Sequence, residues 1–309
     1  GHTKGSSKSW GWCKVWVYWT RHPAGTPNPL PPGAAGCSKK HLNPALSRRK
    51  KKLDSPDSDE LLGGILADCL AAPAAYVLPV RPLTILRERM GYADLRIVLK
   101  GSSDPEGRIF ASILDSGDES QKSGCTLGQY YRLEVLGVPG ADRMLSLLGA
   151  SLGARMDASR PPCTFHDLPQ EQPPSALAIA VSSRYFDSQA ICATLCVLDP
   201  RPFLQNLVSE FPSVHPESLE EDLARCLAAF FEASGGLFLC DTGELVALCC
   251  GSRPADPDLL QSQLGKYVRR FFGFSMETPV RIRRSRTFES PNAAEMESFL
   301  ADQLDGPAD

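Results

Sequence analysis

Long apolar runs are missing from this sequence of 309 residues. No stretch of about 18 apolar residues occurs, so the sequence predicts no transmembrane helix. The first residues also lack the apolar core of a secretory signal, which favours a cytoplasmic protein. The composition, 42% hydrophobic and 22% charged, is typical of a globular chain with a sizeable core.

Acidic residues are absent from residues 1–53, whereas eleven of the 33 Lys and Arg residues lie there. This segment therefore has a charge of +11, and the remainder of the chain has a charge of −14. All four tryptophans fall in the first 19 residues, and no helical or strand period holds for long. Residues 1–56 are therefore predicted to be a disordered basic tail.

Three interpretations of this tail stay open. Its aromatic side chains, interleaved with Lys, would stack on bases of a nucleic acid while the cations neutralise phosphate. Its tryptophans would also suit adsorption to an anionic membrane. The third interpretation is that the tail is not native to the protein and has no function.

Spacings typical of metal sites are absent as well. None of the eleven cysteines forms a CxxC pair, and the five histidines show neither HxH nor HExxH spacing. Most cysteines lie inside apolar runs, where a reduced thiol packs as a small hydrophobic group. We expect reduced core cysteines, with disulfides or a metal or redox site as the alternatives. The residues concerned are Cys192, Cys196, Cys226, Cys240 and Cys249.

No P-loop and no GxGxxG motif after a strand occurs. Gly149, Ser151 and Gly153 match the GxSxG pattern of a nucleophile elbow literally. That elbow needs a strand directly before it, and the sequence predicts a helix at this place. A hydrolase that uses His166 or His215 stays an alternative.

Residues 57–160 are predicted to form a small β-rich domain with flanking helices. Helices are expected over 57–70 and 141–152, and strands over 95–99, 108–114 and 130–136. A Pro-rich linker, 161–174, follows the domain. The arginines of this domain are expected to solvate a face or to pair with acids such as Glu88 and Asp94, and phosphate binding is the alternative. They are Arg81, Arg87, Arg89 and Arg96.

Residues 175–305 are predicted to form an α/β domain with the order β-α-α-β-β-α-β-α. The apolar run 191–198 indicates a buried strand, and the runs 237–240 and 245–250 indicate a hairpin. Asp256 before Pro257 is typical of a helix start. Ser218 and Glu221 have the spacing of a capping box, and Gly235-Gly236 is expected to end that helix. The remaining elements are helices over 203–211, 218–234, 257–273 and 292–304 and a strand over 280–288.

Three short segments of this domain have a recognisable pattern: Asp199-Pro-Arg201-Pro-Phe203, Asp241-Thr-Gly243-Glu244-Leu245 and Ala301-Asp302-Gln303-Leu304. With the element order, they resemble the GGDEF (diguanylate cyclase) domain, a member of the nucleotide-cyclase fold. That family's first strand ends in D-x-D-x-F, and its hairpin reads Gly-Gly-Asp/Glu-Glu-Phe. Its closing helix often holds Ala-Asp before a Leu.

The resemblance implies an α+β protein whose second domain has a ferredoxin-like or nucleotide-cyclase-like antiparallel sheet. It also implies that Asp199 would hold a divalent metal on a bound nucleotide and that Glu244 is the remaining hairpin acid. Gly243 stands where the family has its second metal carboxylate. Asp241 and Thr242 replace the glycines that let the backbone approach the nucleotide.

These departures predict a degenerate signalling domain: a non-catalytic regulatory or protein-interaction module. Its expected partners are proteins, with a nucleotide as a further candidate and Mg²⁺ needed only where nucleotide binding is retained. An active cyclase-like enzyme using Asp199 and Glu244 is the alternative. A plainer interpretation also stays open, in which Asp199 caps the next helix and residues 241–244 are ordinary turn chemistry.

Overall fold

The computed structural model describes residues 57–72, 76–100, 107–115, 122–137, 142–158, 168–240, 244–273, 280–289 and 293–304. The chain divides into two compact units, Gly1–Gly64 and Ile65–Asp309. The predicted tail, 1–56, lies outside the described residues, so its disorder stays a prediction. None of the described helices is long and apolar enough to cross a membrane.

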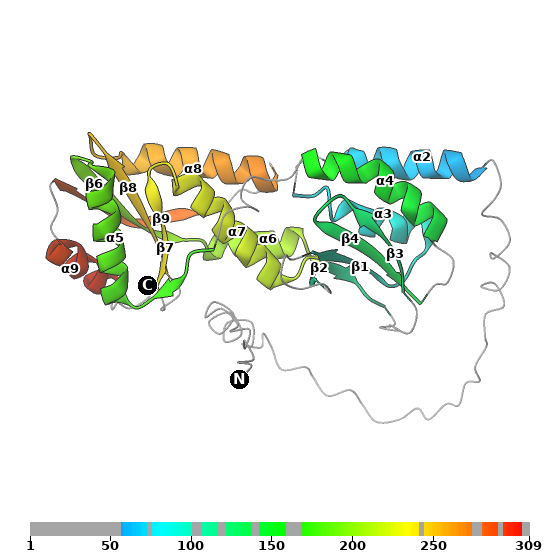
Figure 1. The fold of residues 1–309 in the computed structure, drawn as a ribbon, viewed down its shortest axis with the longest axis horizontal. Helices are drawn as coiled ribbons and strands as arrows, with labels where there is room; N and C mark the ends of the chain where they lie inside the picture. The colour runs from blue at the N-terminus through cyan, green and yellow to red at the C-terminus, as the bar shows by residue number, and fades with distance from the viewer. Residues whose placement is uncertain are drawn as a thin grey trace, which may run out of the picture. The chain divides into compact units, whose positions relative to one another are not determined.

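The first sheet has four antiparallel strands in the order β2-β1-β4-β3 (Figure 1). The predicted strands and the two flanking helices are confirmed, whereas α3 and β3 were not predicted from the sequence. The β3 segment, KSGCTL, alternates exposed and buried residues but has few apolar ones, so its periodicity was weak. The elements are α2 (Asp57–Leu70), α3 (Arg81–Met90), β1 (Leu95–Leu99), β2 (Arg108–Ile113), β3 (Lys122–Leu127), β4 (Tyr131–Leu136) and α4 (Asp142–Ala158).

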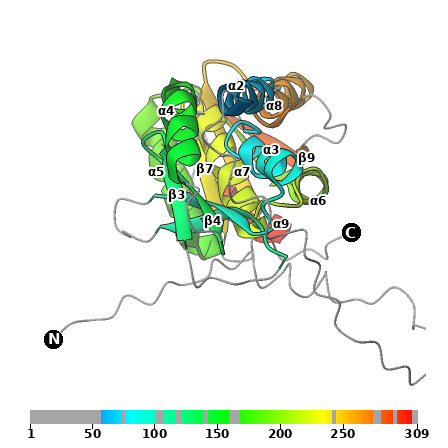
Figure 2. The same ribbon diagram turned by 90° about the vertical axis from the view of Figure 1, so that its right-hand side faces the viewer.

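Helix α4 packs closely against β3, and Figure 2 shows the two elements adjacent. A Cβ atom at Gly149 would lie 2.6 Å from the carbonyl oxygen of Thr126, and one at Gly153 would lie 2.8 Å from the backbone nitrogen of Gly128. Glycine is therefore needed at both positions for this close approach. The two glycines of the literal GxSxG match serve packing, and Ser151 lies on the exposed face of the helix.

The second sheet has the order β5-β7-β8-β6-β9. All neighbouring strands are antiparallel except β5 and β7. Its last four strands occupy the order of the split β-α-β, or ferredoxin-like, arrangement, so the chain is an α+β protein as predicted. The elements are β5 (Glu171–Gln172), α5 (Pro174–Ser188), β6 (Cys192–Asp199), α6 (Arg201–Glu210), α7 (Pro216–Phe231), β7 (Gly235–Cys240), β8 (Leu245–Gly251), α8 (Pro257–Phe272), β9 (Arg281–Glu289) and α9 (Ala293–Leu304).

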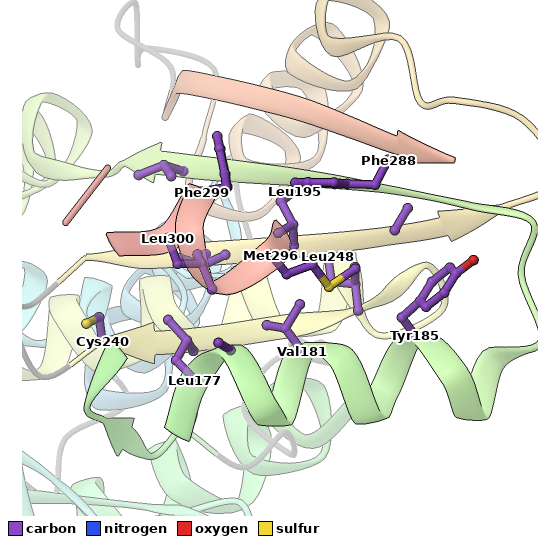
Figure 3. Packing of buried hydrophobic residues seen from close by; sticks show 14 residues of the cluster. Leu177, Val181, Tyr185, Leu195, Cys240, Leu248, Phe288, Met296, Phe299 and Leu300 are labelled. Carbon is purple, nitrogen blue, oxygen red and sulfur yellow. The ribbon is translucent and has the colours of Figure 1, made fainter. Parts of the chain in front are cut away.

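One face of the second sheet is covered by α5 and α9, which also contact each other. Figure 3 shows Val181 of α5 and Met296 of α9 pointing toward Leu195 and Leu248 of the sheet. All four side chains are almost completely buried. Alternate residues of β6 point to the opposite face, where the side chains of Thr194 and Cys196 are fully buried too, so β6 is the doubly covered strand that its apolar run predicts.

The ends of the helices agree with the sequence in some places and not in others. The Asp256 carboxylate accepts hydrogen bonds from the backbone nitrogens of Asp258 and Leu259, which confirms it as the N-cap of α8. The predicted capping box of Ser218 and Glu221 is wrong, because α7 begins at Pro216 and Ser218 is buried inside its first turn. Gly235-Gly236 opens β7 instead of ending α7, which ends at Phe231.

The predicted linker, 161–174, contains structure at its end. Residues 159–167 lie outside the described residues. Glu171 and Gln172 form β5, and helix α5, which was not predicted, begins at Pro174. A β-bridge between Ala111 and Val214 joins the β2 strand to the segment before α7. The residues from Ile65 onward form one compact unit, so independent folding of 57–160 and 175–305 stays a prediction.

The cysteines of the described residues are free, and all but the partly exposed Cys250 are buried. This confirms the predicted burial of Cys192, Cys196, Cys226, Cys240 and Cys249. Burial raises the pKa of the Cys69 thiol to about 12 and that of Cys125 to about 11. These two side chains therefore pack as protonated, apolar groups.

Candidate functional site

The fold brings together the two acids that the sequence singles out. Asp199 is the last residue of β6, and Glu244 stands directly before β8. The final pair in the ladder between these strands is Leu198 with Leu245. Asp199 and Glu244 therefore lie one step beyond this pair, at the same end of two adjacent strands.

Arg201 holds Asp199 from the first turn of α6. Its Nε donates to Oδ1 of Asp199 at 2.7 Å, and its Nη2 donates to Oδ2 at 3.1 Å. The backbone nitrogen of Arg201 also donates to Oδ1, at 3.2 Å. This forked pairing is the strong geometry for a guanidinium and a carboxylate, and it occupies both oxygens of the acid.

Arg283 of β9 reaches Glu244 from the other side of β6. The register of β9 against β6 shifts between the pairs Val197–Arg284 and Leu198–Ile282, so Arg283 occupies a bulge. A bulge redirects a side chain out of the regular alternation. Here Nη1 of Arg283 donates to Oε1 of Glu244 at 3.4 Å. We call Asp199, Arg201, Glu244 and Arg283 the carboxylate–guanidinium cluster.

The arginines keep Asp199 ionised. Burial by itself would raise the pKa of this carboxyl, but the hydrogen bonds and charge of Arg201, with the charge of Arg283, lower it below its ordinary value. The same pairing raises the pKa of Arg201, against a smaller opposing effect of burial. The cluster therefore contains two acids and two permanent cations.

Such an arrangement is a poor divalent metal site. Mg²⁺ needs several free oxygen ligands in octahedral geometry, and both oxygens of Asp199 already accept hydrogen bonds from a cation. A metal ion would have to displace Arg201 or sit beside its positive charge. Within the described ranges, no group of three or more His, Cys, Asp or Glu side chains is placed to hold a metal ion.

The tip of the hairpin, with Asp241, Thr242 and Gly243, lies outside the described residues. Their predicted place beside a nucleotide therefore stays a prediction.

The plainer interpretation of Asp199, in which it caps the next helix, is supported in part. Asp199 accepts a hydrogen bond from the first backbone N–H of α6, although the residue in the N-cap position is Pro200.

The arginines Arg81, Arg87 and Arg89 of α3 and Arg96 of β1 each have a partner elsewhere in the chain. Arg87 pairs with Asp115, Arg89 with Asp68, and Arg96 with Glu134. The Nε of Arg81 lies 3.5 Å from the carbonyl oxygen of Asp68. These pairs agree with the expected structural role. Each acid lies far from its arginine in the chain, so the fold brings these partners together.

The two histidines considered for a hydrolase have different outcomes. His166 lies outside the described residues. Nε2 of His215 lies 3.1 Å from the hydroxyl of Ser112, in the segment where β2 meets the residues before α7. The serine of the GxSxG match, Ser151, is on α4.

In comparisons with known proteins, no protein-family model matches this chain, and no curated protein matches it. The GGDEF-like interpretation therefore depends on a few residues and on the topology. Of the cluster, Arg201 was visible in the sequence because it replaces the family's second aspartate. No sequence pattern indicated that Arg283 would meet Glu244, since its position depends on a bulge and on the pairing of β9 with β6.

Proposed function

We propose that this chain is a non-catalytic regulatory or protein-interaction module whose second sheet has the topology of a nucleotide-cyclase-like domain without its metal chemistry. One observation carries the proposal. Asp199, for which the resemblance implies a metal ion, and Glu244, the remaining hairpin acid, are each paired with an arginine.

Physical chemistry favours the non-catalytic function over a cyclase. Two-metal or one-metal phosphoryl chemistry needs cations that bridge carboxylates and phosphate oxygens. In the cluster, guanidinium groups already neutralise the carboxylates. The arginines supply charge and hydrogen-bond donors, which suit the binding of an anionic group of a partner or a nucleotide but provide no activated nucleophile.

The first test measures Mg²⁺ and nucleotide binding together with turnover. The full chain is titrated with GTP and Mg²⁺ by calorimetry, and the formation of pyrophosphate and cyclic dinucleotide is followed. We expect no turnover. Replacement of Arg201 by Ala should strengthen Mg²⁺ binding by about tenfold, because it removes the cation that occupies Asp199.

A matched control is Arg270→Ala, which removes an exposed arginine of α8 and should leave Mg²⁺ binding unchanged. Magnesium-dependent product formation by the unmodified chain that disappears in Asp199→Ala would show that the enzyme alternative is correct. Binding of nucleic acid or membrane through residues 1–53 is a separate proposal, and removal of those residues without loss of binding would eliminate it.

A further inference from the structure

A cleft of about 680 Å³ lies beside α3 and includes none of the residues of the carboxylate–guanidinium cluster. Its three walls are residues 77–87 of α3 and the turn before it, residues 112–115 at the end of β2, and residues 210–213 between α6 and α7. We call it the α3 cleft. Its volume is within the range of sites that bind small molecules.

Two of the walls are joined by hydrogen bonds, so the cleft is formed before any ligand enters. The backbone nitrogen of Ser112 donates to the carbonyl oxygen of Ser213 at 2.7 Å, and that of His215 donates to the carbonyl oxygen of Phe110 at 3.0 Å. The contact between Ser112 and His215 adds a side-chain link. A preformed site spares a ligand the entropy cost of ordering the walls.

Apolar side chains make up part of each wall. Val80 and Phe211 are nearly buried, with 6% and 7% of their surfaces exposed, and they form a fixed apolar lining. Leu114 is 46% exposed, which leaves apolar surface for a ligand to cover.

The cationic groups of the cleft lie on a single wall. Arg81, Thr84 and Arg87 follow one another at intervals of three residues, so they share a face of α3. Arg87 is held by the two oxygens of Asp115, both at 3.1 Å. For Arg81, the described residues supply one long bond to a carbonyl oxygen and no carboxylate. The first turn of α3 also contains no acid, so the positive end of the helix adds to the charge of Arg81.

Acidic side chains on the other walls limit the kind of anion. The charge of Asp115 is balanced by Arg87, and Glu210 adds a negative charge on the wall between α6 and α7. A doubly or triply charged phosphate would be repelled by Glu210, whereas a singly charged acid group would meet one cation, Arg81. We propose that the α3 cleft binds a small organic carboxylate with an apolar body, its acid group on Arg81 and Thr84 and its body against Val80, Leu114 and Phe211.

The test uses octanoate, a carboxylate with an apolar chain, and the fluorescent monoanion 8-anilinonaphthalene-1-sulfonate as its reporter. The full chain is titrated with the reporter, and octanoate is then added as competitor. We expect Arg81→Gln to weaken the binding of both by about tenfold, the loss typical of one charged hydrogen bond. Leu114→Asp should weaken binding similarly, because it adds negative charge to the apolar wall.

The matched control is Arg89→Gln, which removes an arginine of the same helix that pairs with Asp68 and is not part of the cleft. It should retain the affinity within about twofold. Near-UV circular dichroism checks that all three variants are folded. The proposal is overturned if Arg81→Gln and Arg89→Gln behave alike, or if GTP displaces the reporter and octanoate does not. These outcomes are independent of the metal-binding test, since no cluster residue lines the cleft.

Discussion

The acid–arginine pairs of the two sheets differ in how far their side chains are exposed to water. In the first sheet, Arg96 of β1 and Glu134 of β4 stand directly opposite each other in the ladder, with side chains only 9% and 7% exposed. In the second, Asp199 and Arg201 are two residues apart at the end of a strand, and their side chains are 16% and 43% exposed. The first pair is enclosed, whereas the second is open to water on the arginine side.

This difference separates a structural pair from one that is able to function. A buried pair has a large desolvation cost and is strongly destabilised when one partner is lost. A pair open to water contributes little to stability, so its partners can change at low cost. We therefore expect substitutions in the first sheet to act on folding and substitutions of the cluster to act on binding.

The largest expected effect follows from a substitution that breaks the buried pair of Arg96 and Glu134. Replacing Arg96 with Met leaves the buried Glu134 carboxylate with the ion pair to the partly exposed Arg132. We expect the free energy of unfolding to fall by about 3 kcal/mol, measured by urea denaturation. The double variant Arg96→Met, Glu134→Leu should recover most of this loss. A single variant as stable as the unmodified chain would contradict the structural role of the pair.

The next effect is a pH dependence that originates at α7. Burial raises the pKa of Asp222 to about 6, partly opposed by Tyr76, Arg225 and Arg108, and Glu221 raises it further. Because the folded state holds this proton more tightly than the unfolded chain, the contribution of Asp222 to stability is greatest below about pH 4 and is lost as the pH rises to about 6. The loss from this group is up to about 3 kcal/mol. Denaturation curves measured between pH 4 and 7 would show it.

Asp222→Asn should remove this part of the pH dependence. Glu220 contributes a slope of the same sign, because burial and the charges of Glu217 and Glu221 raise its pKa to about 7. Asp187→Asn, a change at an exposed acid of α5, serves as the control and should keep the profile of the unmodified chain. A profile of Asp222→Asn that matches this control would refute the assignment.

The smallest expected effect concerns the close contact of α4 with β3. Gly149→Ala places a methyl group 2.6 Å from the carbonyl oxygen of Thr126, so the helix must move away. The overpacking cost of about 2 kcal/mol is reduced by the better helix propensity of Ala, which leaves a net loss of about 1 kcal/mol in thermal or urea unfolding. Ser151→Ala changes an exposed side chain of the same helix and should be neutral. Equal stabilities of the two variants would contradict the packing role of Gly149.

Much of the second sheet could be predicted because its patterns are local. The apolar run of β6, the Asp256-Pro257 helix start and the hairpin of β7 and β8 each depend on neighbouring residues. The missed elements had weak local signals. Helix α3 is rich in charge and contains Pro82, and β3 contains Gly124 in a short polar run. The capping box failed because Pro216 starts α7 one turn early, and a spacing alone does not show which turn is first.

The sequence by itself determined the α+β class, most strands and helices, the burial of the core cysteines and the position of Asp199 at a strand end. These follow from periodicity, helix-start signals and apolar runs, which are properties of adjacent residues. Only the tertiary structure decided that Arg283 meets Glu244 and that Arg81 stands in a cleft with Leu114 and Phe211. Those contacts join residues far apart in the chain, and their geometry depends on strand register, a bulge and the packing of α3, which no local pattern encodes.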